Sequence, residues 1–170
     1  MMTADREIAT ALIPLTTGES IVPYPGVWAD TPYEVRAGRP VIAEDPGLSA
    51  LVVDRDRGTV LLLDGHGESV VNSSLAALAE CARRYSAAIR TSDADDESWI
   101  AIGTDLLAQI RIIDPGVADA EDSFWAVAAE ELGYGMHTRS GCDGRRETRG
   151  SGRWLPRRPA YRRGRCGWRR

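Results

Sequence analysis

Two apolar runs with a turn between them dominate the middle of the chain. Residues 48–53 and 59–63 are rich in Val and Leu, and the segment between them contains Asp54, Asp56 and Gly58. Aspartate side chains bond turn amides, and glycine takes the positive φ of a bulged hairpin loop. A second turn at residues 64–67 leads into a short strand-like run at 68–71. This pattern predicts a three-stranded antiparallel meander.

A helix is predicted directly after the third strand, with Ser73 or Ser74 as its N-cap. Beyond the cap, apolar residues recur at steps of three and four: Leu75, Leu78, Ala82, Tyr85 and Ile89. A stripe of this kind faces a core while the charged side of the helix stays in water. The helix should therefore cover one face of the sheet.

The segment before the meander is predicted to be less regular. We expect a short helix at residues 5–12, with Ile8 and Leu12 facing inward and Pro14 ending it. An irregular stretch rich in Pro and Gly follows at residues 16–38. Val41 and Ile42 would then begin the sheet.

A long helix is expected after an acidic run at residues 92–97, because carboxylates are favoured at a helix N-terminus. Gly103 would weaken this helix by about 1 kcal/mol relative to Ala, and the Asp114-Pro115 pair would end it. Its predicted apolar face consists of Trp99, Ile102, Leu106, Ile110 and Ile113.

A last helix is expected with Asp119 as its cap and Gly133 as its C-terminal cap. Its apolar residues are Phe124, Val127, Ala128 and Leu132. A short helix, an antiparallel sheet and then helices together predict the α+β class, with a β-meander sheet and helices packed on one face.

The formal net charge of -4 combines two different parts of the chain. Residues 1–136 carry 23 acidic and 9 basic side chains, whereas residues 137–170 carry 2 acidic and 12 basic ones. We predict that residues 1–38 form the N-terminal helix and irregular segment of a domain whose core is 39–136. Residues 137–170 would be a disordered Arg- and Gly-rich tail.

Three interpretations of this tail stay open. It contains Arg but no Lys, together with Gly, Pro and Trp, which is typical of a frameshift in DNA rich in G and C. The same Arg residues could bind nucleic acid through phosphate contacts, with aromatic residues stacking on bases. The tail could also be attracted to the acidic body.

Residues suited to enzymatic chemistry are few and scattered. The two His and three Cys residues show no metal-ligand spacing, and glycine-rich phosphate loops are absent from the sequence. We therefore predict no catalytic residue, no metal and no cofactor, with Cys81 acting as a small hydrophobe. The enzymatic alternative is a hydrolase that uses His66 with a nearby carboxylate.

Several short segments together resemble the SUKH superfamily, most closely its fourth group of bacterial immunity proteins. They are the Asp-rich turn closing at Gly58, the strand after it, and residues 70–75, 112–115, 123–125 and 130–132. The resemblance covers about residues 39–136. It implies an antitoxin-like α+β domain that binds a cognate toxin of a polymorphic toxin system, often a nuclease or deaminase. It implies no catalytic residues.

An acidic body would attract the basic surface with which such a toxin holds phosphates. We expect the toxin-binding residues among exposed acids and aromatics: Trp28, Asp54, Asp56, Asp64 and Glu68. The alternatives are a non-toxin protein-protein adaptor of the same fold, and nucleic-acid binding through the tail. The sequence has neither an apolar run of about 20 residues nor a signal peptide, so we expect a cytoplasmic protein without a membrane partner.

Overall fold

The computed structural model describes residues 3–90 and 96–135. Most of the acidic run 92–97 and the whole predicted tail lie outside these residues. The elements, in chain order, are α1 (Asp5–Thr16), β1 (Val27–Trp28), β2 (Val35–Arg36), β3 (Arg39–Asp45), β4 (Ser49–Val53), β5 (Val60–Asp64), β6 (Gly67–Asn72), α2 (Leu75–Arg90), α3 (Asp96–Ile113) and α4 (Phe124–Gly133).

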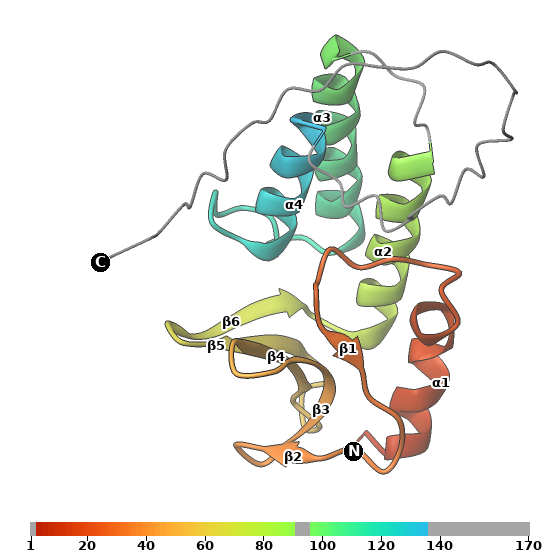
Figure 1. The fold of residues 1–170 in the computed structure, drawn as a ribbon, viewed down its shortest axis with the longest axis vertical. Coiled ribbons are helices and arrows are strands. Elements are labelled where there is room, and N and C mark those ends of the chain that lie inside the picture. Colours follow the sequence, from red (N-terminus) through yellow and green to blue (C-terminus); the bar gives the residue numbers. More distant parts are fainter. Residues whose placement is uncertain (1–2, 91–95, 136–170) are drawn as a thin grey trace, which may run out of the picture. The chain divides into compact units, whose positions relative to one another are not determined.

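The strands form one antiparallel sheet in the order β1-β3-β4-β5-β6, with the two-residue strand β2 also paired to β3. The predicted meander is therefore confirmed, and β1 and β2 add short strands within the segment expected to be irregular (Figure 1). The turn chemistry is as predicted. The Asp54 carboxylate accepts hydrogen bonds from the amides of Asp56 and Arg57 at 3.0 and 3.2 Å, and Gly58 has a φ of 75°.

The two faces of the sheet are buried in different ways. Leu51, Val53 and Val60 belong to the main core, which also contains the buried residues of all four helices. On the opposite face Val52, Leu61 and their strand neighbours form a second, smaller cluster made of strand residues alone. The helices therefore pack on one face, as predicted.

The sheet coils around this second cluster. Arg39 at the start of β3 is hydrogen-bonded to Glu68 in β6, although β4 and β5 lie between these strands. Strands three positions apart in a flat sheet would be separated by about 14 Å. Coiling brings the two side chains together and leaves Val52 fully buried without a covering helix.

The first helix corrects one prediction. Pro14 does not end α1, which continues to Thr16. Leu15 is 4% exposed and packs into the core, and this burial offsets the hydrogen bond that Pro cannot donate. The hydroxyls of Thr16 and Thr17 both donate to the Ile13 carbonyl and so cover the end of the helix.

The last helix corrects three more predictions. Ser123, not Asp119, occupies the N-cap position of α4, because residues 114–123 form a longer loop than expected. Gly133 lies inside the helix, and Tyr134 follows it as the C-cap. Val127 is 39% exposed, whereas Trp125 next to Phe124 is fully buried.

A buried polar network joins the sheet to the helices. The Asn72 side chain, at the end of β6, is fully buried and donates to the Asp114 carboxylate at 2.9 Å. It accepts a hydrogen bond from the Trp125 indole at 3.0 Å, and its amide nitrogen also lies 3.6 Å from the Cys81 sulfur. The Ser73 backbone amide donates to the same Asp114 oxygen at 2.8 Å. These contacts link β6, α2, α4 and the loop after α3.

Replacing Asn72 by Ala should lower the free energy of unfolding by about 3 kcal/mol, because the buried Asp114 carboxylate and Trp125 indole would each lose a partner. Urea unfolding followed by tryptophan fluorescence measures this change. Ser69→Ala, at an exposed position of the same strand, should stay within about 0.5 kcal/mol of wild type. A loss below about 1 kcal/mol for Asn72→Ala would contradict the structural importance of the network.

Gly103→Ala should destabilise the protein by about 2 kcal/mol, although Ala normally favours a helix. A methyl group at this position would lie 2.4 Å from the Ala129 carbonyl oxygen of α4. The reverse exchange Ala108→Gly, at an exposed site of α3, should cost about 1 kcal/mol through helix propensity alone. Thermal unfolding of both variants tests the pair, and a more stable Gly103→Ala protein would show that the helices are not in close contact.

Candidate protein-interaction site

The structure distributes the predicted toxin-binding residues over two ends of the sheet. Asp54 and Asp56 belong to the turn between β4 and β5, whereas Asp64 lies at the other end of β5. A five-residue strand separates these turns by about 17 Å. Glu68 lies in β6, and Trp28 in β1 is partly buried against the main core. The five residues therefore do not form one compact patch.

Glu68 is hydrogen-bonded to Arg39, whose guanidinium is also influenced by the charge of Asp54. The pKa of the Arg39 guanidinium is raised, first by its hydrogen bond to Glu68 and also by the charge of Asp54. The guanidinium neutralises one of these two negative charges. Asp64 is also engaged, since its carboxylate accepts from the backbone amides of His66 and Gly67 at 2.7 and 3.1 Å.

His66 and Cys81 are the candidate chemical groups among the described residues. Within residues 3–90 and 96–135, no hydrogen bond or ion pair joins the His66 imidazole to a carboxylate. Cys81 is fully buried, and burial raises the pKa of its thiol to about 11, which makes it a poor nucleophile. Its predicted role as a small hydrophobe is confirmed.

In the part of the chain that the structure describes, no cluster of three or more His, Cys, Asp or Glu residues is placed to hold a metal ion. None of the helices in that part combines the length and apolar character that crossing a membrane requires.

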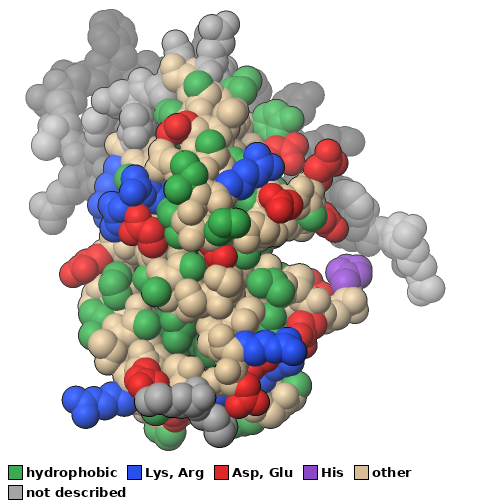
Figure 2. All heavy atoms as spheres, turned by 180° about the vertical axis from the view of Figure 1, so that it is seen from behind, with side chains coloured by type: hydrophobic (Ala, Val, Ile, Leu, Met, Phe, Trp, Pro, Cys, Tyr) green, Lys and Arg blue, Asp and Glu red, His purple; other side chains and the backbone are tan. Residues whose placement is uncertain are grey.

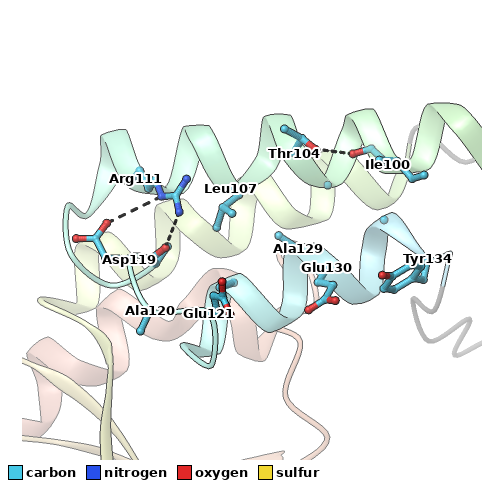
Figure 3. A pocket seen from close by; sticks show the side chains of 14 residues that line it. Ile100, Thr104, Leu107, Arg111, Asp119, Ala120, Glu121, Ala129, Glu130 and Tyr134 are labelled. Carbon is cyan, nitrogen blue, oxygen red and sulfur yellow. Dashed lines mark hydrogen bonds and ion pairs between the residues drawn. The ribbon is translucent and has the colours of Figure 1, made fainter.

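A hollow lies along α3 and α4, and we call it the α3–α4 groove. It has a volume of about 570 Å³ and is lined by Ile100, Gly103, Thr104, Leu107, Arg111, Ala118, Asp119, Ala120, Glu121, Ala126, Ala129, Glu130, Gly133 and Tyr134. Figure 3 shows Ile100, Thr104, Leu107 and Arg111 in a row along α3, facing a second row from α4 and its preceding loop. The spacing of the first row is that of one helix face.

Small residues bring the two helices close together at the floor of the groove. An added methyl at Gly103 would lie 2.4 Å from the Ala129 carbonyl oxygen and 3.1 Å from the Gly133 nitrogen. Such close backbone contact fixes the separation of α3 and α4. Larger side chains at the two sides of this contact then form the walls of the groove.

Acidic residues concentrate on this helix pair. Residues 96–135 contain nine acidic side chains and a single basic one, Arg111, whereas residues 3–90 contain 12 acidic and 8 basic ones. Arg111 donates to the Ala118 carbonyl at 3.1 Å and lies 4.0 Å from the Asp119 carboxylate. The face of the molecule in Figure 2 shows acidic, basic and apolar side chains interspersed. Only the distribution along the chain reveals the acidic excess of the helix pair.

The sequence analysis did not identify this groove, although α3 carries a signal for it. The helix has its predicted core face, with Trp99, Leu106 and Ile110 all buried, and yet Ile100 and Ile112 are 60% and 81% exposed. A helix that is apolar beyond its core-facing stripe has apolar surface available for a second contact. Which of those positions meets a groove depends on the placement of α4.

The comparison with protein families gave one match. The SUKH-4 immunity protein model matches residues 28–131, which include the sheet except for Val27, together with α2, α3 and most of α4. The comparisons with curated proteins and with solved structures gave no match. The match begins inside the predicted N-terminal segment 1–38, and the predicted domain boundaries stay a prediction. Because the match covers more than half of the chain, this protein belongs to the SUKH-4 immunity protein family.

Proposed function

We propose that this protein neutralises a cognate toxin domain of a polymorphic toxin system by binding to it. The family match carries the proposal, because it assigns residues 28–131 to a family of immunity proteins. Inhibition by binding requires a complementary interface of about 1,200–2,000 Å² and no reactive group. The absence of a catalytic arrangement around His66 and Cys81 within the described ranges is compatible with that requirement.

The charge of the protein favours a toxin that acts on nucleic acid, such as a nuclease or a deaminase. The described residues carry 21 acidic and 9 basic side chains. Enzymes that hold phosphates present basic surfaces, and an acidic inhibitor both associates faster with such a surface and covers it. We place the encounter in the cytoplasm, where the nucleic-acid substrate of such a toxin is found.

The meander surface remains part of this proposal. Asp54, Asp56, Asp64, Glu68 and Trp28 are available for contacts at two ends of the sheet, with Asp56 and Asp64 exposed in their turns. Glu68 is already paired with Arg39, so it would contribute less to attraction than an unpaired carboxylate would.

The test uses the full chain and the C-terminal domain encoded by the adjacent upstream gene, measured by calorimetry at low and moderate salt. We expect one-to-one binding with a Kd of about 10 nM or tighter, weakening by about tenfold or more as salt rises. Co-expression should protect host cells from the same domain.

Two results would count against the proposal. A full chain that neither binds this domain nor protects the cell would favour the adaptor interpretation. Binding to RNA that weakens steeply with salt, without binding to the domain, would favour the tail as a nucleic-acid-binding segment.

A further inference from the structure

The α3–α4 groove is built from apolar surface that the described fold leaves open. Ile100 and Tyr134, at one end of the groove, are 60% and 70% exposed, and Leu107 and Ala129 lie further along it. Figure 3 shows Leu107 on α3 directed toward α4, with Glu121 and Glu130 at the opposite edge. An apolar hollow rimmed by polar residues is typical of an interaction site.

The dimensions of the groove suit a protein segment better than a small ligand. Its volume of about 570 Å³ would hold a small molecule, but sites for such molecules bury most of the ligand surface. Here the rim residues Thr104, Asp119, Glu121 and Glu130 are all exposed. The Thr104 hydroxyl donates to the Ile100 carbonyl at 2.9 Å, so it is already engaged within α3. An open trough with a few apolar anchor positions fits an extended or helical piece of another protein.

Carboxylates of the described residues differ in whether an Arg side chain pairs with them. In residues 3–90, Glu44, Glu68, Asp5 and Glu80 are each paired with Arg side chains. Hydrogen bonding from Arg83, supported by Arg84, lowers the pKa of Glu80 to about 2. By contrast, Glu121 and Glu130 form no ion pair with any residue of the described ranges.

We propose that the α3–α4 groove receives a basic amphipathic segment of the toxin, with an apolar side chain on the Leu107–Ala129 floor and Arg or Lys residues on Glu121 and Glu130. The proposal rests on the function proposed above and identifies the surface that performs it. Charge complementarity selects this occupant, because the unpaired carboxylates attract a basic partner while the apolar floor contributes the close packing of a binding hot spot.

Charge-reversal variants of the full chain test the electrostatic half of the proposal against the same upstream-encoded domain. Glu121→Arg with Glu130→Arg should weaken binding by about 100-fold at low salt, with a smaller difference at high salt. The matched control Glu19→Arg with Glu34→Arg makes the same change in net charge at exposed positions outside the groove. It should stay within about fivefold of wild type.

A second pair of variants, both in α3, tests the apolar part of the proposal. Ile100→Ser removes a groove residue and should weaken binding by about tenfold. Ile112→Ser removes the same side chain at an 81% exposed position of α3 that does not line the groove, and it should leave the Kd unchanged. Circular dichroism and thermal unfolding of each variant separate lost binding from lost folding.

The outcomes distinguish this inference from the proposed function. Failure of the wild-type chain to bind and protect refutes both. The wild-type chain could bind, with binding retained by the groove variants and abolished by Asp56→Arg with Glu68→Arg. That result overturns the proposed role of the groove and favours the meander surface. Tighter toxin binding by the Glu121→Arg, Glu130→Arg variant would assign the groove to a basic segment of this same chain. A dimer that Ile100→Ser dissociates would assign it to a second copy, and either result overturns the proposal.

Discussion

The position of the helices on the sheet depends on one buried amide, that of Asn72. Its nitrogen donates to the Asp114 carboxylate and its oxygen accepts from the Trp125 indole, and all three side chains are at most 2% exposed. A carboxylate in an apolar interior is strongly destabilising unless its hydrogen bonds are complete. The last strand of the meander, the loop after α3 and the first turn of α4 must therefore lie at fixed positions for the core to close.

This constraint also determines the shape of the candidate interaction surface. Asp114 holds the end of α3 and Trp125 holds the start of α4, so both helices leave the network with fixed directions. Gly103 then sets how closely they approach, because its missing side chain lets the Ala129 carbonyl lie directly over α3. The walls of the groove are consequently in place before any partner arrives, and preorganised walls reduce the entropy lost on binding.

The predictable part of the fold is the part that local patterns encode. The meander follows from short aliphatic runs and from Asp54 and Asp64, whose carboxylates bond amides two and three residues away. Ser74 likewise accepts from the Ala77 amide, three residues further along the chain. Asn72 and Asp114 are 42 residues apart, so no local pattern could pair them. Family resemblance did predict the fold, but it carried no information about which surface meets a partner.

The site was harder to predict because net charge and charge placement are different properties. An acidic body predicts attraction to a basic partner, but it does not say where the partner binds. In the sheet and in α2, ion pairs such as Arg39–Glu68 stabilise the coiled strands and the helix surface. Pairing with Arg reduces the electrostatic field of the carboxylates involved. Residues 96–135 have only one Arg for nine acidic side chains, so pairing within this segment cannot cancel their charge. The negative charge of this segment therefore lies where the fold also leaves apolar surface open. An interface needs charge and apolar surface at the same place.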